Sequence, residues 1–449
     1  MHAERARQWV HIGSGSFALL LRVLTWWQAA ALAAFALAFN IVALPRIGGR
    51  RLYRPADEAR GFPLGIVLYP LAVLLLILIF PSRLDIVAAA WGILALGDGA
   101  ATLAGRAATA TGAKAAKRAL PWHPDKTVIG TTAFIVFGGL AGVALAWWVR
   151  PHVVPLPPMA FTIAAPLVAA VAAAFVETIP VRLDDNVSVP AAAALVLWLA
   201  SLMDAGSWEA ARPGVAAALP WAIAVNAGTA WAGYRAKTVS MSGAIGGAIV
   251  GIVIYAGSGL GGWILLFAAF LAAAVTSRLG LQRKTLLGIA EARGGRRPAG
   301  NAIANCGVAA LAAIAAVTTP HTHVALVALV AALAAGGSDT VASEIGKAWG
   351  TSTYLVTTFG RVKPGTPGAM SVEGTAAGLV AAAALAALGV ALGLAPGSAI
   401  VPVVAGATSG ALVESALAAT FEGAVILNND MLNFINTAVA AAIAILVAA

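Results

Sequence analysis

Charged residues are scarce in this chain. Only 10% of its 449 residues are Asp, Glu, Lys or Arg, whereas 61% are hydrophobic and the mean hydropathy is +0.90. A soluble domain carries roughly a quarter charged residues, so this composition excludes a globular protein surrounded by water. The single cysteine, Cys306, excludes an internal disulfide and leaves the redox compartment open.

Several familiar enzyme signatures are also missing. The chain has no GxxxxGK[ST] loop, no HExxH pair, no CxxC pair and no nucleophile elbow. Soluble nucleotide-binding folds and zinc proteases therefore find no support. The first apolar segment is not followed by a small-residue cleavage site, so we expect it to stay in the protein.

Apolar runs near the length needed to cross a bilayer, roughly 17–25 residues, recur along the whole chain. The frequent Ala and Gly residues suit close contact between helices in lipid. We expect an all-α polytopic integral membrane protein with about 14–15 transmembrane segments in two related halves. The spanning or half-spanning ranges are 8–24, 28–44, 62–80, 84–104, 128–149, 159–180, 187–203, 216–234, 239–256, 260–276, 301–318, 323–345, 372–394, 400–420 and 432–449.

The basic residues predict the orientation. If the N-terminus is cytoplasmic, 24 of the 28 Lys and Arg residues fall on the cytoplasmic side, and the exceptions are Arg22, Arg83, Arg150 and Arg212. This bias is the positive-inside rule, and it explains the net charge of +10 better than binding to nucleic acid does. We expect a cytoplasmic N-terminus and cytoplasmic active sites, in the inner membrane if the source is bacterial.

The acidic residues share that face. Under the same orientation 15 of the 18 Asp and Glu residues are cytoplasmic, and several lie inside or at the end of an apolar segment. An ionisable group at membrane depth is costly and usually marks a functional site. Acids that can hold a divalent cation, beside bases that can hold phosphate, indicate nucleotide chemistry.

The two halves repeat one order of motifs. GDGAATLAGR (97–106), KTVIGT (126–131) and VETIPVRLDDN (176–186) are followed later by GSDTVASEIGK (337–347), SVEGT (371–375) and VESALAATFEG (413–423) with NND (428–430). This order indicates a tandem duplication or a fusion of related units. We expect a first domain over 1–205, a linker over 206–219 and a second domain over 220–449.

In the first half, an Asp followed by small residues, a Lys-Thr at a helix start and an acid-rich turn could together hold phosphate and Mg²⁺. Each motif also has a structural alternative: a helix cap or ion pair, a snorkelling lysine, and ordinary turn chemistry. The candidate residues are Asp98, Arg106, Lys126, Thr131, Glu177, Asp184, Asp185 and Asn186.

In the second half the same residue types recur, together with a basic loop over 278–305 that surrounds Glu291. A basic loop that only sets the topology would explain its charge, but it would not explain the amides at positions 301 and 305, which face one way on a helix. The candidates are Lys237, Arg296, Arg297, Asn301, Asn305, Asp339, Glu344, Lys363, Glu373, Thr375, Glu414, Asn429 and Asp430.

Residues 5–203 resemble the plant phytol kinase branch of the dolichol kinase family, through HIGSG, GDGAATLAGR, KTVIGT and FVETIPVRLDDNVSVP. The resemblance implies that CTP phosphorylates an isoprenoid alcohol. Dolichol kinases usually carry a Glu before the Gly-Thr, where this chain has Ile129, and this departure favours the phytol kinase branch.

Residues 220–449 resemble the family of plant phytyl-phosphate kinase and its animal transmembrane relatives. The resemblance rests on long motifs, among them AKTVSMSGAIGGAIVG, GIAEARGGRRPAGNAIANCGVAAL, GGSDTVASEIGKAWG, TTFGRVKPGTPGAMSVEGTAAGL and LNNDMLNFINT. It implies that a prenyl monophosphate is converted to the diphosphate.

Together the two resemblances imply a membrane phosphotransferase that uses CTP or another nucleoside triphosphate, with Mg²⁺, on an isoprenoid alcohol and then on its prenyl monophosphate. A nucleotidyltransferase that forms a CDP-lipid, and a transporter, which the internal repeat and the intramembrane acids would suit, remain alternatives. We expect catalytic roles for Asp98, Lys126, Glu177, Asp339, Glu344, Glu373 and Glu414. We expect phosphate binding by Arg106, Thr131, Lys237, Arg296, Arg297, Asn301, Asn305, Lys363 and Thr375, and metal binding by Asp184, Asp185, Asn186, Asn429 and Asp430.

Overall fold

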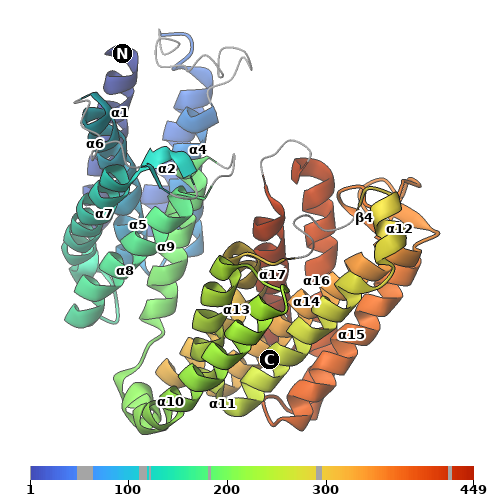
Figure 1. Cartoon of the computed structure of the whole chain (residues 1–449). Coiled ribbons are helices and arrows are strands. Elements are labelled where there is room, and N and C mark those ends of the chain that lie inside the picture. The colour runs from blue at the N-terminus through green and yellow to red at the C-terminus, as the bar shows by residue number, and fades with distance from the viewer. Residues whose placement is uncertain are drawn as a thin grey trace. The chain divides into compact units, whose positions relative to one another are not determined.

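The computed structural model describes residues 2–47, 64–110, 119–120, 123–179, 184–289, 296–422 and 427–448. The chain folds into two compact units, Met1–Ser201 (unit 1) and Leu202–Ala449 (unit 2). Both units are built mainly of helices (Figure 1), and each is described by itself.

Unit 1 consists of apolar helices and one small hairpin of β-strands on the chain between two of them. Its elements are α1 (His2–Ser14), η1 (Gly15–Arg22), α2 (Trp26–Val42), α4 (Leu64–Ile79), α5 (Leu84–Gly92), η3 (Ile93–Asp98), α6 (Gly99–Ala110), β1 (Ala119–Leu120), β2 (His123–Thr127), α7 (Val128–Val149), η4 (Arg150–His152), α8 (Met159–Glu177) and α9 (Asp185–Ser201).

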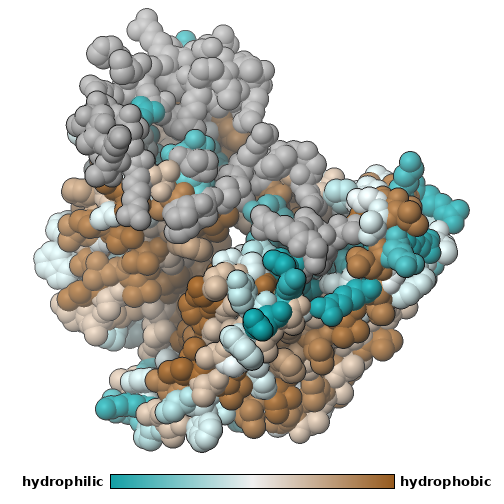
Figure 2. All heavy atoms as spheres, in the orientation of Figure 1, coloured by the Kyte–Doolittle hydropathy of each residue, from teal (hydrophilic) through white to brown (hydrophobic). Residues whose placement is uncertain are grey.

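Unit 2 has the same general composition. Its elements are α10 (Ala205–Arg235), α11 (Met241–Arg278), α12 (Leu281–Leu286), α13 (Ala299–Thr318), α14 (Thr322–Trp349), β3 (Thr353–Leu355), β4 (Ala369–Ser371), α15 (Val372–Ala391), η6 (Gly397–Ala399), α16 (Ile400–Leu417), η7 (Ala418–Glu422) and α17 (Asn429–Ala448). Figure 2 shows apolar side chains along these helices and hydrophilic ones gathered near α12 and β4.

The helices confirm the predicted all-α polytopic membrane fold. Within the described residues, ten helical segments are long and apolar enough to cross a membrane, and α2, α4 and α9 are shorter apolar helices. Each of the fifteen ranges predicted from the sequence coincides with a helical segment. Long apolar runs form helices in lipid because a helix satisfies its own backbone hydrogen bonds.

Helix α11 contains two of the predicted segments. Its 38 residues would extend about 57 Å if the helix were straight, but Gly259 adopts a non-helical conformation with φ 71°. Both ends of α11 contact Arg297: the Ser240 amide donates to the Arg297 carbonyl (3.0 Å), and the Arg297 guanidinium donates to the Ser277 hydroxyl (3.1 Å). The chain therefore reverses at Gly259, and the helix forms a hairpin with two arms.

The residues predicted as a linker, 206–219, are helical in the structure. These residues belong to helix α10, which begins after Asp204, and the Asp204 carboxylate accepts a hydrogen bond from the Ser207 amide (2.7 Å). An Asp that caps a helix in this way satisfies one of the free amides of the first turn. The boundary between the compact units lies just before this cap, between Ser201 and Leu202.

The two units repeat one order of elements. In each, a helix with an internal Asp precedes a β-hairpin, and a Thr or Ser at the end of the hairpin caps the next helix: Thr127 accepts from Gly130, and Ser371 accepts from Gly374. Among the ten candidate spans, the two with the internal Asp are the most buried: 72% of the most apolar stretch in Leu84–Ala108 and 78% of that in Thr322–Trp349 are buried, against at most 39% in the other eight. The motif repeat seen in the sequence is thus also a repeat of architecture.

Candidate active site

Asp98 lies on the central helix of unit 1, where the helix changes its winding. Residues Ile93–Asp98 form a π-helical segment between α5 and α6. Such segments insert an extra residue into a turn and often occur at functional sites. The adjacent Gly97 packs against the Phe134 ring, where a Cβ would lie only 3.0 Å from ring carbons. Asp98 is 18% exposed and lies among the residues that line a cavity.

Lys126 lies on β2, immediately before the capped start of helix α7. Its ammonium donates a hydrogen bond to Glu177 Oε1 at 2.6 Å and lies 3.5 Å from Asp185 Oδ2. Burial lowers the pKa of the Lys126 ammonium, but the Asp185 and Glu177 carboxylates outweigh this effect, so the pKa is raised above its usual value. The lysine is therefore positively charged at neutral pH.

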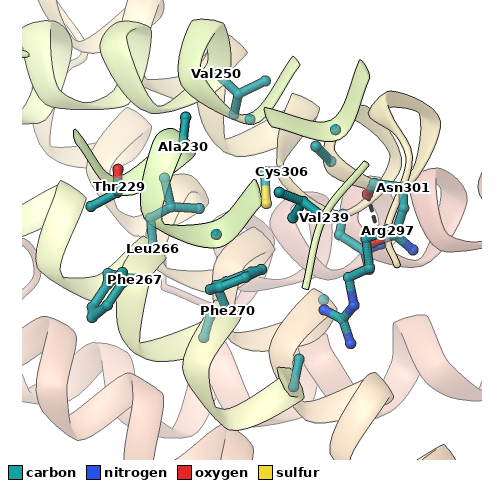
Figure 3. A pocket seen from close by; sticks show the side chains of 18 of the residues that line it. Thr229, Ala230, Val239, Val250, Leu266, Phe267, Phe270, Arg297, Asn301 and Cys306 are labelled. Carbon is teal, nitrogen blue, oxygen red and sulfur yellow. Dashed lines mark hydrogen bonds between the residues drawn. The ribbon is translucent and has the colours of Figure 1, made fainter. Parts of the chain in front are cut away.

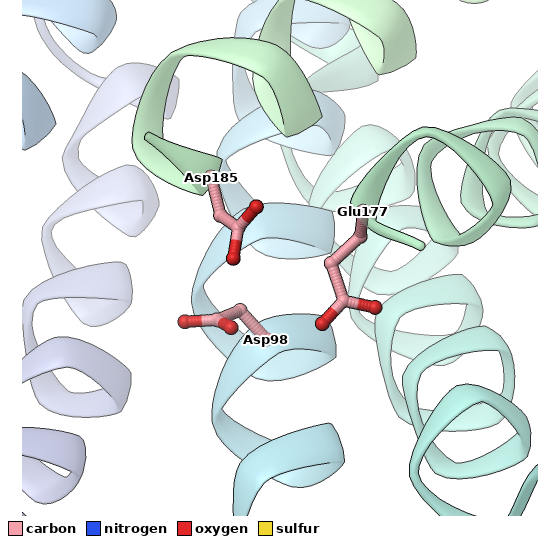
Figure 4. Close-up of side chains that lie close together, drawn as sticks. All are labelled: Asp98, Glu177 and Asp185. Atoms are coloured by element: carbon pink, nitrogen blue, oxygen red, sulfur yellow. The ribbon is translucent and has the colours of Figure 1, made fainter. Parts of the chain in front are cut away.

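Three carboxylates converge beside this lysine (Figure 4). Glu177 is the last residue of α8 and Asp185 is the first residue of α9, so the two helix ends bring them together with Asp98. One oxygen from each of the three carboxylates lies within 4.8 Å of the others. Carboxylate oxygens are the donors that Mg²⁺ prefers, and Mg²⁺ usually takes one or two of them directly. The donor set therefore fits a magnesium ion.

This cluster lies at one end of a cavity of about 1080 Å³ in unit 1. The polar end also contains His11, whose Nε2 lies 3.6 Å from Asp98 Oδ2, and Tyr69, whose ring contacts the His11 ring edge-on. Most of the other lining residues are apolar side chains of η1, α2 and α4, among them Leu24 and Phe35. The arrangement can place a charged reaction centre at one end of an apolar chain.

The other residues predicted in the first half have mixed surroundings. Arg106 is exposed and lines the cavity. Asp184 and Asn186 also line it, but Asp184 Oδ1 accepts hydrogen bonds from the backbone amide (3.0 Å) and side chain (2.7 Å) of Asn186. The Thr131 hydroxyl donates to the Thr127 carbonyl of its own helix (3.2 Å). Of the three residues predicted to bind metal at 184–186, the structure brings Asp185 into the carboxylate cluster.

Glu344 in unit 2 belongs to a buried ion pair. Its Oε2 accepts a hydrogen bond from Lys284 Nζ at 2.5 Å, and its Oε1 accepts one from Lys347 at 3.1 Å. Lys284 is 1% exposed, and its ammonium also donates to the carbonyls of Ser277 (2.7 Å) and Thr276 (3.4 Å) at the end of α11. These contacts join α11, α12 and α14, so the geometry favours a structural role for Glu344 over the predicted catalytic one.

The remaining predicted acids of unit 2 do not meet at one point. Glu373 accepts hydrogen bonds from the amide (3.0 Å) and hydroxyl (2.5 Å) of Thr351, after the end of α14, whereas Asp339 lies inside that helix. Glu414 accepts from the Asn436 side chain at 2.7 Å. Within the part of the chain that the structure describes, only the Asp98 cluster places three metal-binding side chains together. Sequence order alone had predicted such a cluster in each half.

The predicted phosphate ligands of unit 2 divide into two groups. Arg297, Asn301 and Asn305 line a second pocket, described below. Lys237, Arg296 and Lys363 are exposed, and Thr375 donates to the Ser371 carbonyl of its own helix (2.8 Å). Asn429 and Asp430 begin α17, and the Asp430 carboxylate lies against Gly300, where an added Cβ would collide with it. Glu291 lies outside the described residues.

Some groups near these sites were not among the predicted site residues. His11, Tyr69 and His123 line the cavity of unit 1, and Lys284 is the partner of Glu344. The sequence contained a signal for two of them, because Tyr69 lies in an otherwise apolar span and His11 lies where the first apolar segment begins. The Lys284–Glu344 pair joins positions 60 residues apart, and no local pattern could have predicted it.

Comparison with known proteins places the second unit in a family. Residues 224–441 match the family described as integral membrane protein DUF92. No solved structure matches the chain.

Three relatives align over less than half of this chain. This chain is 37% identical to Protein VTE6, chloroplastic, of Arabidopsis thaliana over 216 aligned residues. The alignment covers 46% of this chain and 65% of the plant protein. The chain is 38% identical over 200 residues to an uncharacterized membrane protein of Synechocystis (44% of this chain, 78% of the relative). It is 32% identical over 213 residues to one of Methanocaldococcus jannaschii (47% and 87%). Through its second unit, the chain therefore belongs to the DUF92 family of integral membrane proteins.

Proposed function

We propose that unit 1 phosphorylates a membrane-embedded isoprenoid alcohol, with a nucleoside triphosphate as the phosphoryl donor. The observation that carries the proposal is the Asp98, Glu177, Asp185 and Lys126 cluster at the polar end of the cavity. Phosphoryl transfer needs little beyond positioning and charge stabilisation, and this cluster can supply both. The resemblance to the phytol kinase branch supports CTP as donor and a prenol such as phytol as acceptor.

The residues of the site would have separate roles in binding the metal ion and the phosphates. Asp98, Glu177 and Asp185 would hold Mg²⁺, which when bound neutralises the charge of the phosphates. Lys126 and Arg106, both at the polar end, would bind phosphate oxygens. The alcohol group would lie beside this cluster, and its chain would lie along the apolar walls.

The cavity depth fits a long chain. Its lining residues extend along the first segment from Gln8 to Leu24, over the α-helical α1 and the 3₁₀-helical η1. At rises of about 1.5 and 2.0 Å per residue, this distance is roughly 25–30 Å. The hydrocarbon core of a bilayer is about 30 Å thick, so the cavity can hold an alcohol whose tail reaches across most of the membrane.

Unit 2 would convert the resulting prenyl monophosphate to the diphosphate. This part of the proposal rests on the DUF92 membership and on the resemblance to the phytyl-phosphate kinase family. Two sites on one chain would raise the effective concentration of the intermediate. The distribution of basic residues along the sequence supports a cytoplasmic N-terminus and cytoplasmic sites in this proposal.

The experiment uses the full-length protein in lipid nanodiscs with Mg²⁺, a panel of prenols, and CTP labelled either on the γ-phosphate or on the base. We expect γ-label, and no base label, in the lipid product. Asp98→Asn should lower the first phosphorylation on the order of 10²-fold or more, because a preorganised charge group is removed. Asp125→Asn is the matched control, since Asp125 is exposed and does not line the cavity.

Two results would contradict the proposal. Base label on the lipid would identify a nucleotidyltransferase that forms a CDP-lipid. Movement of prenol or prenyl phosphate across vesicles without nucleotide, with no labelled lipid, would identify a transporter.

A further inference from the structure

Unit 2 contains a groove whose described lining residues include no Asp or Glu (Figure 3). It lies between α10, both arms of α11, α13 and α14. Figure 3 shows Arg297 and Asn301 at one end and Phe267, Leu266 and Thr229 toward the other. The groove therefore has a charged end at Arg297, and most of its other lining residues are apolar.

An aromatic pair lines the groove away from Arg297. Trp263 Nε1 donates a hydrogen bond to the buried Asn226 Oδ1 at 3.1 Å, which ties α11 to α10. The Trp263 and Phe267 rings stack with centroids 5.3 Å apart. Lining residues on the second arm of α11 extend from Trp263 to Ala273, a depth of about 15 Å at 1.5 Å per residue. This depth suits one part of a lipid chain.

Among the residues that the structure describes, the positive charge at the polar end has no acidic partner. Arg297 is half-buried, and its guanidinium donates to the Ser277 hydroxyl (3.1 Å). No carboxylate among the described residues lies within ion-pair distance of it. A half-buried guanidinium without an ion-pair partner among the described residues is suited to bind phosphate, which it can contact with two parallel hydrogen bonds.

Asn305 adds an unsatisfied polar atom to the same groove. Its side-chain nitrogen donates to the Asn301 carbonyl (2.9 Å), which orients the amide, but its Oδ1 is buried and has no hydrogen-bond partner. A buried acceptor without a donor is rare and usually marks the place of a ligand group or a bound water. The hydroxyl of a singly protonated phosphate monoester could supply this donor.

From these features we propose that the groove binds a lipid monophosphate with a single apolar chain, with its phosphate at Arg297 and Asn305 and its chain directed toward Trp263. The inference rests on the proposed function, because it locates the substrate of the second phosphorylation. One guanidinium and two amides match one phosphate group. Most of the other lining residues are Gly, Ala, Val, Leu and Phe, and the few polar ones among them include Asn226, whose Oδ1 already accepts from Trp263.

The experiment is photocrosslinking of the full-length protein in detergent with prenyl monophosphate that carries a diazirine on its chain, and without nucleotide. We expect labelled peptides from α10 and α11. Arg297→Gln should lower the labelling affinity about tenfold or more, because a charged hydrogen bond is lost. Arg283→Gln is the control, since Arg283 is exposed on α12 and does not line the groove.

A second variant tests the apolar part. Gly247 lines the groove, and a Cβ built there meets no atom within 4 Å, so Gly247→Phe can fill the groove without a backbone clash. It should abolish labelling while the melting temperature stays near that of the wild type. Gly228→Phe on α10 is its control, because Gly228 is equally free of neighbours and does not line the groove.

Competitors separate the possible ligands. Unlabelled prenyl monophosphate should displace the probe, whereas inorganic phosphate, the parent prenol and phosphatidic acid should displace it at least tenfold less well. Labelling that neither Arg297→Gln nor Gly247→Phe reduces would overturn the inference, and so would equal competition by phosphatidic acid. If the groove is labelled as expected but no phosphate is transferred from any nucleotide, the binding site stands and the proposed kinase activity fails.

Discussion

The buried pair between Lys284 and Glu344 allows a quantitative prediction about stability. Lys284 and the Glu344 side chain are 1% and 3% exposed, and their charged atoms are 2.5 Å apart. Removing one partner of such a pair leaves an uncompensated buried charge and costs about 3–5 kcal/mol. Replacing both with apolar side chains of similar size is often nearly neutral.

The contacts around the pair determine which variant loses more stability. In Lys284→Met, Glu344 keeps its contact with Lys347 (3.1 Å), so the cost should lie near the lower limit of about 3 kcal/mol. In Glu344→Gln, the Lys284 ammonium keeps its two backbone carbonyls but loses its anionic partner, so the cost should approach about 5 kcal/mol. The Lys284→Met, Glu344→Leu double variant should be more stable than either single variant.

Thermal unfolding measures the stability of these variants. For a unit of this size, each kcal/mol shifts the melting temperature by about 2–4 °C, so the single variants should lose roughly 6–20 °C. Cys306 is the only cysteine and lies on α13 of unit 2, so its labelling by a thiol reagent against temperature reports on that unit. Arg283→Met, an exposed change on the same short helix, should stay within about 0.5 kcal/mol of the wild type.

One result would refute this reasoning. If Glu344→Gln unfolds at the wild-type temperature but loses the second phosphorylation, Glu344 is catalytic and the pair has no structural role. The double variant decides the same question from the other side, because restored stability with retained activity is possible only if neither charge takes part in the chemistry.

Three further predictions follow from the structure. Ala36→Trp places a large ring in the cavity of unit 1 and should shift the preference of the first phosphorylation toward shorter prenols. Ala38→Trp, on the exposed side of α2, should leave that preference unchanged. Equal chain-length profiles for the two variants would contradict the cavity assignment. Chelation of divalent cations should abolish phosphate transfer, and Mg²⁺ should restore it, because three carboxylates converge at Asp98; full activity in the chelator would contradict the metal site. Ser371→Ala should destabilise unit 2 by about 0.5–2 kcal/mol, measured by its melting temperature, because the cap of α15 is lost, and an unchanged melting temperature would show that this cap is dispensable.

The membrane fold could be predicted from sequence because its determinants are local. A run of apolar residues must form a helix in lipid, and the length of the run shows whether that helix can cross the bilayer. Even the hairpin in α11 was visible, since the predicted segments 239–256 and 260–276 meet at Gly259. The start of α10 was missed because residues 206–215 are too polar for a spanning run, although Asp204 caps them as a helix.

The cluster in unit 1 was only partly predictable. The sequence indicated that Asp98, Lys126, Glu177 and Asp185 lie at one end of their helices, because each stands at or near the boundary of an apolar run. It could not show that these ends converge around a single point, since convergence depends on how α8 and α9 pack beside the central helix. The cavity walls are equally invisible in the sequence, because apolar residues that face a cavity and those that face lipid have the same composition.

By itself, the sequence determined that this protein lies in a membrane, where its apolar helical segments lie, and which residues can carry charge near their ends. Only the tertiary structure decided which of those charges meet: it gathered three carboxylates at Asp98, paired Glu344 with Lys284, and left Arg297 at the end of an apolar groove. The reason is physical. Crossing a bilayer depends on the hydrophobicity of consecutive residues, whereas an electrostatic contact between helices depends on distances that positions 50 or 60 residues apart acquire only when the helices pack.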